Sequence, residues 1–306
     1  MDGLVDVEDA FSQQALSAPW GELGRSATLG LVSLFSKLVV TVLNSFSVDG
    51  LDAFHRHVMS RQPGVGLITV CNHTSTADDP MLFCSMLPAS FFFREHRHHL
   101  NRWSLCAQEI CYKNALLGQF FQSGKTLPIQ ARGPGRGGEL AGGRQAGCRA
   151  ASHPTAHGPG LQRGGGTDQP IMRTVAAEVA RGCWVHIFPE GKVNYTGRVG
   201  PLRWGVGKLV CDARARSDRD PVVLPFYHSG MGGVMPKHKR VPRAGNEVRV
   251  VVGQPVDLSD LTCRWAGAAT RGMQRGCPCM ASRCLAQGWW SRCGGEPSRC
   301  RQRDLP

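Results

Sequence analysis

Short apolar runs that alternate with amphipathic helical patterns constrain the fold of this chain more than any other feature. The apolar runs are rich in β-branched and aromatic residues and cover 66–71, 184–188, 221–227 and 247–252. Helical patterns cover 80–88, 105–121, 170–181 and 202–212. A further strand is expected at 125–130, at a sheet edge, because Pro128 cannot donate a ladder hydrogen bond. Strands alternating with helices predict an α/β fold with a mostly parallel sheet flanked by helices.

An apolar segment, residues 28–46, precedes these elements. Its nineteen residues contain one charge, Lys37, and approach the roughly 20 apolar residues that a membrane-spanning helix needs. Several Ser, Thr and Asn residues dilute its hydrophobicity, so a spanning helix, an interfacial or re-entrant helix and a buried core helix all remain open. We expect a helix that associates with the membrane at the membrane–water interface. Residues 1–22 are acidic and lack the basic residues of a signal or transit peptide.

Two stretches do not match the alternating pattern. Residues 133–166 and 263–306 are rich in Gly and Arg and lack apolar periodicity, which predicts disorder and no part in the chemistry. Translation of non-coding or out-of-frame sequence is an alternative origin for both. Residues 132–166 and 263–306 carry +4 and +6 of the net formal charge of +13. The rest of the chain is therefore only weakly basic, and a nucleic-acid partner is not expected.

The thirteen cysteines show no pairing rhythm, and six of them follow residue 262. An odd count in a chain of this length does not indicate a disulfide framework. The spacing of the late cysteines matches no zinc template. We therefore expect no metal site and no cofactor.

The first candidate for chemistry is the run from Asn72 to Pro80, which follows a predicted strand and precedes a predicted helix. Asp79 suits the N-cap and Pro80 the first helical position. On a regular helix His73 and Asp78 would lie about 140° apart, but in a turn the carboxylate can fold back onto the imidazole. Such a pair fixes the tautomer and makes a general base for an alcohol substrate. The alternative is that His73 is a polar residue of an ordinary turn.

A second candidate is the turn that follows the strand 184–188, because ligands bind at the carboxyl ends of strands in open α/β sheets. Its glycine permits close backbone approach to a ligand, and its lysine offers a cation to a phosphate. A plain β-turn with exposed charges is the alternative. The candidate substrate-binding residues of this turn are Phe188, Pro189, Glu190, Gly191 and Lys192.

Two further candidates are weaker. Arg132 can grip a phosphate bidentately, although an arginine at a loop edge is commonly solvated. Pro225, in the run VVLPFY, can shape an apolar groove for an acyl chain, although a strand bulge is the alternative.

Taken in order, four blocks resemble the motifs of the glycerolipid acyltransferase superfamily: Asn72–Asp78, Arg132, Phe188–Gly191 and Val223–Pro225. The resemblance covers roughly residues 28–132 and 170–258 and implies an α/β acyltransferase fold. Within the superfamily, the run WVHIFPEGKVN resembles the transacylase branch, because relatives that use acyl-CoA usually continue F-P-E-G-T-R. This chain departs from the family pattern at the extra residue before Arg132 and in the tail after Leu261.

The resemblance to the transacylase branch implies CoA-independent acyl exchange between phospholipids and lysophospholipids, with remodelling of cardiolipin as the typical role. It also implies mitochondrial membranes, with the enzyme facing the intermembrane space. An acyl-CoA-dependent lysophospholipid acyltransferase is the first alternative. A non-catalytic membrane-binding protein is the second.

The expected organisation follows from these observations. An acidic segment (1–27) and the apolar segment (28–46) precede an acyltransferase domain (47–262), which the Arg-rich tail (263–306) follows.

Overall fold

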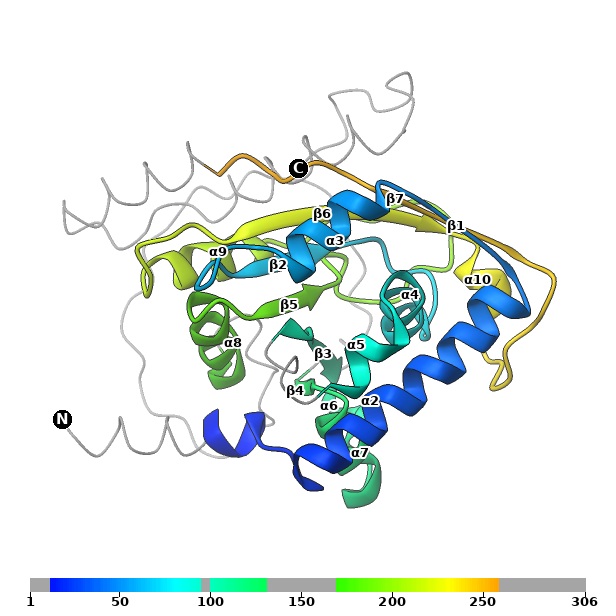
Figure 1. Cartoon of the computed structure of the whole chain (residues 1–306), viewed down its shortest axis with the longest axis horizontal. Helices are drawn as coiled ribbons and strands as arrows, with labels where there is room; N and C mark the ends of the chain where they lie inside the picture. Colours follow the sequence, from blue (N-terminus) through cyan, green and yellow to red (C-terminus); the bar gives the residue numbers. More distant parts are fainter. Residues whose placement is uncertain (1–11, 95–99, 131–168, 259–306) are drawn as a thin grey trace, which may run out of the picture.

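The computed structural model describes residues 12–94, 100–130 and 169–258 (Figure 1). These residues form a seven-stranded sheet in the spatial order β1-β7-β6-β2-β5-β3-β4. Neighbouring strands are parallel except β6 and β7, which pair antiparallel. The expected α/β class with a mostly parallel sheet is confirmed. The strands are β1 (Ser45–Asp49), β2 (Leu67–Val70), β3 (Trp103–Ala107), β4 (Thr126–Ile129), β5 (Trp184–Ile187), β6 (Val222–Ser229) and β7 (Glu247–Val252).

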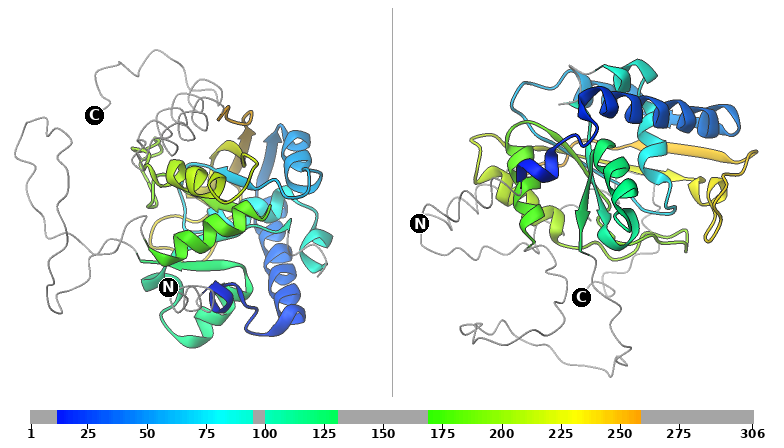
Figure 2. Two further views of the ribbon diagram at one scale, coloured as in Figure 1. Left: turned by 90° about the vertical axis from the view of Figure 1, so that its left-hand side faces the viewer. Right: turned by 90° about the horizontal axis from the view of Figure 1, so that it is seen from below.

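Helices cover both faces of the sheet (Figures 1 and 2). The helices of the first face are α2 (Gly21–Lys37), the π-helical η1 (Leu38–Val42), α3 (Leu51–Met59), α4 (Asp78–Met86) and α5 (Ala89–Phe93). The helices of the second face are α8 (Pro170–Ala180) and α9 (Gly205–Arg214). Short helices α6 (Gln108–Cys111) and α7 (Ala115–Ser123) lie between β3 and β4 in the chain, and α10 (Met231–Val234) follows β6.

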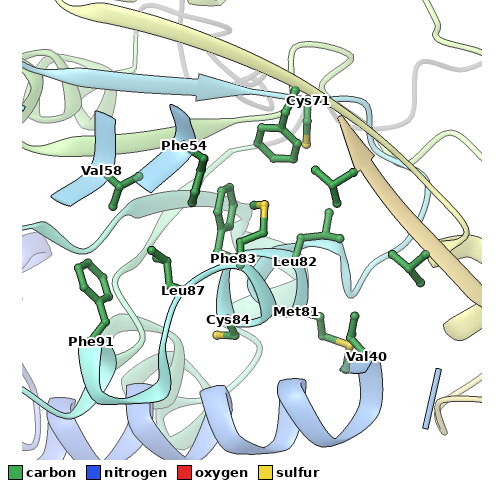
Figure 3. Close-up of a cluster of buried hydrophobic side chains, with 14 of the residues drawn as sticks. Val40, Phe54, Val58, Cys71, Met81, Leu82, Phe83, Cys84, Leu87 and Phe91 are labelled. Carbon is green, nitrogen blue, oxygen red and sulfur yellow. The ribbon is translucent and has the colours of Figure 1, made fainter. Parts of the chain in front are cut away.

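The two cores follow from the alternation of side chains along each strand. Leu224 and Phe226 of β6 belong to the core beneath α2–α5, whereas Val223 belongs to the core beneath α8 and α9. In the first core, Figure 3 shows Val40 of η1 beside Met81 of α4. A strand buried on both faces is expected to be a continuous apolar run, which is why the sequence pattern located β2, β5 and β6 well.

The apolar helix is present, but it differs from the expected segment at both ends. It begins at Gly21, within the acidic segment, and residues 45 and 46 belong to β1. Residues 21–42 are long and apolar enough to cross a membrane by length and composition, yet half of the most apolar window is buried inside the domain. Gly30 permits this packing, because a Cβ there would lie 2.1 Å from the ring of Phe93 on α5.

The predicted helix at 105–121 is wrong in its first part. Trp103–Ala107 forms β3, which fills the sheet between β5 and β4. The helical pattern is instead divided into α6 and α7, and α7 restarts at a conventional cap, where the side chain of Asn114 accepts from the backbone N–H of Leu117. Pairing with two neighbouring strands overrode the local helical periodicity of this segment. The predicted edge strand at 125–130 is confirmed as β4.

One disulfide joins Cys106, near the end of β3, to Cys111 at the end of α6. Sequence reasoning did not predict it, because its short local span gives no framework spacing. Cys71, Cys84, Cys183 and Cys211 are free thiols. The stretch 133–166 and the tail 263–306 lie outside the described residues.

Candidate active site

The carboxyl ends of β2, β6 and β5 are held together by hydrogen bonds around the turn that carries His73. The side chain of Asn72, which follows β2, donates to the carbonyl of His228 (2.9 Å) and accepts from its N–H (3.0 Å). From the other side, Glu190 Oε1 accepts from the backbone N–H of His73 (3.0 Å). The backbone N–H of Asn194 donates to the His73 carbonyl (2.6 Å). Three strands distant in sequence therefore fix one short turn.

Within this turn Asp78 folds back onto His73. Its Oδ2 accepts hydrogen bonds from His73 Nδ1 (3.0 Å) and from the backbone N–H groups of Thr74 (2.7 Å) and Ser75 (2.9 Å). Burial of the Asp78 carboxyl raises its pKa, but the nearby His228 and the hydrogen bonds from both histidines outweigh burial and lower the pKa to about 2. Asp78 is therefore a carboxylate at neutral pH, and the backbone N–H groups orient it toward the imidazole.

The His73 ring is held in one orientation with one nitrogen available. Because a carboxylate only accepts, Nδ1 carries the hydrogen and Nε2 bears the lone pair. The ring stacks on Phe188, with centroids 3.7 Å apart and an interplanar angle of 12°. The side chain is 16% exposed, and no described residue hydrogen-bonds its Nε2. This arrangement can take a proton from a hydroxyl group that enters from solvent or membrane.

The turn after β5 lies against His73, although its residues differ in what they contact. Phe188 supplies the stacking surface, and Pro189 is buried with its carbonyl bonded to the N–H of Arg203 (2.8 Å). Glu190 is buried, and its Oε2 accepts from Asn194 Nδ2 (2.7 Å) and the N–H of Gly200 (2.9 Å). All bonds of the Glu190 carboxylate thus go to protein donors, so it holds two loops together.

Gly191 and Lys192 complete this turn. Gly191 has a φ of 66°, and a Cβ there would lie 2.7 Å from Arg203 Nε, so both conformation and space favour glycine. Lys192 is exposed on the same turn.

Pro225 is not brought to the His73–Asp78 pair. Pro225 pairs with Val70 in the middle of β6. By alternation it faces the α8–α9 side of the sheet, opposite Phe226 and His228. Arg132 lies outside the described residues.

His228 was missed by sequence reasoning. It is fully buried at the end of β6, with Nε2 2.8 Å from the Asn72 carbonyl and 3.5 Å from Asp78 Oδ2. Its Nδ1 is buried without a hydrogen-bond partner among the described residues. The only signal in the sequence was a histidine three residues beyond Pro225, at a strand end.

A second ion pair fixes the start of α4. Asp79 has extended backbone angles, so the regular helix starts at Pro80 as expected from its N-cap position. Its carboxylate, however, does not cap the helix but bonds to the Arg102 guanidinium and the Ser104 hydroxyl. The Asp79 side chain thereby ties the turn of His73 to β3.

His186 lies beneath the site and is uncharged at neutral pH. Its burial lowers the pKa to about 3, so the ring stays neutral among aromatic neighbours that include Phe188. In residues 12–94, 100–130 and 169–258 no group of three His, Cys, Asp or Glu side chains could hold a metal ion.

Known proteins match this chain over most of its length. The family model described as Acyltransferase matches residues 47–229. N-acylphosphatidylethanolamine synthase from Arabidopsis thaliana is 32% identical, over 78% of this chain and 72% of that protein. Tafazzin from Drosophila melanogaster is 32% identical over 75% of this chain, which spans 50% of that protein. Tafazzin from Saccharomyces cerevisiae is 26% identical, over 79% of this chain and 65% of that protein.

A solved structure, the 1-acyl-sn-glycerophosphate acyltransferase PlsC from Thermotoga maritima, is 15% identical with a TM-score of 0.45, covering 82% of this chain and 81% of that chain. The sequence comparisons confirm the expected resemblance to the glycerolipid acyltransferases, and three of the similar proteins are tafazzins. The family match begins within β1, ends with β6 and contains the His73–Asp78 turn. The chain therefore belongs to the acyltransferase family and is an acyltransferase.

Proposed function

We propose that this enzyme transfers an acyl chain from a phospholipid to a lysophospholipid without CoA, with His73 as general base and Asp78 as its partner. The observation that carries the proposal is the 3.0 Å bond between His73 Nδ1 and a buried carboxylate, which leaves Nε2 available at the sheet edge. The likeness to proteins named Tafazzin supports the choice of lipid donor.

The proposed step needs no nucleophile from the protein. Nε2 of His73 takes the proton of the lysophospholipid hydroxyl as its oxygen attacks the donor's ester carbonyl carbon. The tetrahedral intermediate collapses with cleavage of the original ester bond. The departing glycerol oxygen takes the proton back from Nε2, so the histidine ends as it began. Asp78 stabilises the imidazolium that exists between the two proton transfers.

The energetics allow an intact phospholipid to be the donor. The ester that breaks and the ester that forms are nearly equal in energy, so the exchange is reversible and requires no activated thioester. One histidine serves both directions because the incoming and departing groups are both alcohols. The finer role that we propose is acylation of monolysocardiolipin in mitochondrial membranes, on the side of the intermembrane space.

The substrate contacts of the β5 turn form a second part of the proposal. The exposed Lys192 offers a cation to a lipid phosphate, and the exposed backbone of Gly191 is the candidate for close contact with a head group. Phe188 covers one face of the His73 imidazole. Glu190 holds the loop after β5 against the His73 turn and does not contact the lipid. Arg132 is retained as the candidate for a phosphate contact. Pro225 is not retained for the acyl chain, because it lies on the face of the sheet opposite Phe226 and His228.

The apolar helix is proposed to hold the enzyme at the membrane interface. One side of α2 and η1 is packed on the domain, and this side includes the buried hydroxyls of Ser33 and Ser36. The opposite side exposes large apolar residues at helical spacing: Leu23, Leu31, Leu34, Phe35, Leu38 and Val42. A helix that buries half of its surface in its own domain presents only one face to lipid, which suits interfacial rather than spanning insertion.

The Arabidopsis relative motivates a second candidate acceptor. The product named in N-acylphosphatidylethanolamine synthase carries its acyl group on an amine. A general base at His73 could activate an amine as well as a hydroxyl, so phosphatidylethanolamine belongs among the tested acceptors. An acyl-CoA-dependent lysophospholipid acyltransferase is the alternative for the donor.

The deciding experiment uses purified full-length protein and CoA-depleted vesicles. Phosphatidylcholine with a labelled acyl chain is the donor, and monolysocardiolipin or phosphatidylethanolamine is the acceptor. We expect label in cardiolipin, loss of this transfer in His73→Ala, and normal transfer in His57→Ala, which alters a half-buried histidine on α3. Label in N-acylphosphatidylethanolamine would favour the second candidate. Transfer that appears only after addition of acyl-CoA would refute the CoA-independent mechanism.

A further inference from the structure

A strongly cationic loop, residues 236–243, protrudes between α10 and β7. It carries Lys237, Lys239, Arg240 and Arg243, and the sequence has no Asp or Glu between Gly230 and Asn246. All four cations are exposed, and no described carboxylate pairs with them. The loop is closed at its base by a bond from the Arg243 N–H to the Val234 carbonyl (2.8 Å). A closed loop with four unneutralised cations is a permanent positive feature of the surface.

The cationic loop is attached to the catalytic turn. Ser75, in the turn between His73 and Asp78, donates its hydroxyl to the carbonyl of Met235 (3.1 Å), immediately before the loop. Lys237 Nζ lies 5.4 Å from the ring centroid of Tyr195, which belongs to the loop after β5. The positive charge is therefore on the same edge of the sheet as the reacting histidine.

The same loop joins the exposed apolar face of the N-terminal helix. The N–H of Gly245 donates to the carbonyl of Leu43 (2.9 Å), and Asn44 Nδ2 donates to the carbonyl of Arg243 (3.0 Å). In Figure 1, α10 lies near the carboxyl end of α2. Val42 and Leu43 are exposed there, and Val241, among the cations, is 72% exposed. Apolar side chains bordered by Lys and Arg are typical of surfaces that rest in a bilayer interface.

We propose that the cationic loop binds the phosphates of anionic lipids in the bilayer surface and so directs the active site to anionic membranes. This inference rests on the proposed function for the lipid substrate, although it concerns binding and not turnover. A bilayer surface has phosphate groups that can pair with the cations of the loop, and acyl chains beneath them that can receive the exposed apolar side chains. Nucleic acid would leave the exposed Val42, Leu43 and Val241 without a partner.

The test compares two triple variants of the full-length protein in vesicle sedimentation. The first, Lys237→Gln/Lys239→Gln/Arg240→Gln, removes three cations of the loop. The matched control, Arg181→Gln/Arg216→Gln/Arg219→Gln, removes three exposed cations that precede β5 and β6, at the opposite edge of the sheet. Vesicles contain phosphatidylcholine with or without phosphatidylglycerol. Unfolding temperatures of both variants are measured to verify the fold.

For wild-type protein we expect tighter binding to vesicles that contain phosphatidylglycerol. Each cation near an anionic surface contributes about 5-fold in partitioning, so the loop variant should lose on the order of 100-fold. The control should lose far less. High salt should abolish the difference, because the screening length falls from about 8 Å to about 3 Å between physiological salt and 1 M.

Equal losses in the two variants, or equal binding of wild type to both kinds of vesicle, would overturn the proposal. A loss of RNA binding with unchanged vesicle binding would reassign the loop to nucleic acid and overturn it as well. The result is independent of catalysis. Selective vesicle binding without CoA-independent transfer would refute only the proposed function, and transfer without selective binding would refute only this inference.

Discussion

Replacement of Asp78 by Asn tests whether the charge of the buried carboxylate is needed for acyl transfer. The side chains have the same shape, so the amide oxygen can take the place of Oδ2 and keep the bonds from His73 Nδ1 and from the two backbone N–H groups. The amide nitrogen then occupies the place of Oδ1, which has no hydrogen-bond partner among the described residues. The variant therefore preserves geometry while removing the negative charge.

The magnitude follows from the distance between the two groups. For unit charges 3.0 Å apart, an effective dielectric constant of about 20 gives about 5.5 kcal/mol of attraction between imidazolium and carboxylate. The retained neutral hydrogen bond returns about 1 kcal/mol of that loss. We therefore expect kcat to fall by about 10³- to 10⁴-fold, since each 1.36 kcal/mol is a factor of ten. KM should change little, because Asp78 is buried and does not reach the lipid.

The assay is the transfer of labelled acyl chains from phosphatidylcholine to monolysocardiolipin in vesicles, with protein concentration and bound fraction measured in parallel. Asp218→Asn, at an exposed aspartate after α9, is the matched control and should retain wild-type rates. Thermal unfolding establishes that the Asn variant is folded. A folded Asp78→Asn enzyme with kcat within about tenfold of wild type would refute the role of the charge, because general-base catalysis contributes about 10²- to 10⁴-fold.

Four further predictions concern neighbouring features. Glu190→Gln should destabilise the fold by about 1–3 kcal/mol in urea unfolding and lower the rate, because one buried donor loses its acceptor; unchanged stability would contradict its bridging role. His228→Ala should lower kcat about tenfold at constant KM, from loss of a hydrogen bond near Asp78, with partial rescue by Gln; a raised KM alone would place it against substrate instead. Gly230→Ala should lower the free energy of unfolding in urea by at least about 2 kcal/mol, because the new Cβ would lie 1.9 Å from a backbone carbonyl oxygen of β7. Gly245→Ala, also at positive φ but with open space around it, should lower it by about 1 kcal/mol. Equal losses in the two variants would contradict the close approach at Gly230. The lowered pKa of Asp78 should stabilise the fold by about 2 kcal/mol above pH 4, and this contribution should disappear as the pH falls from 4 to 2; acid titrations of unfolding that coincide for wild type and Asp78→Asn would refute it.

The sequence alone determined the features that depend on near neighbours along the chain. The β-branched and aromatic runs located β2, β5, β6 and β7, and the position of Asp79–Pro80 located the start of the regular part of α4. The five-residue spacing of His73 and Asp78 in a turn predicted a pair, and the structure brings the two side chains together. Local chemistry sufficed because strand runs, caps and tight turns involve residues a few positions apart.

Only the tertiary structure decided which distant groups surround that pair. Glu190 contacts His73 from 117 residues away in the sequence, and His228 contacts Asn72 from 156 residues away. Nothing in their local sequence indicates those partners. Likewise, residues 103–107 form β3 because they pair with β5 and β4 in the sheet. Alternation along β6 places Pro225 on the face away from the site.

The apolar helix shows the same division. Its composition permitted a spanning, interfacial or buried helix, and packing against α4 and α5 buries one side and leaves the other exposed. The physical reason is that strand pairing and helix packing are chosen by the total burial and hydrogen bonding of the whole domain. A sequence window contains only part of that free energy.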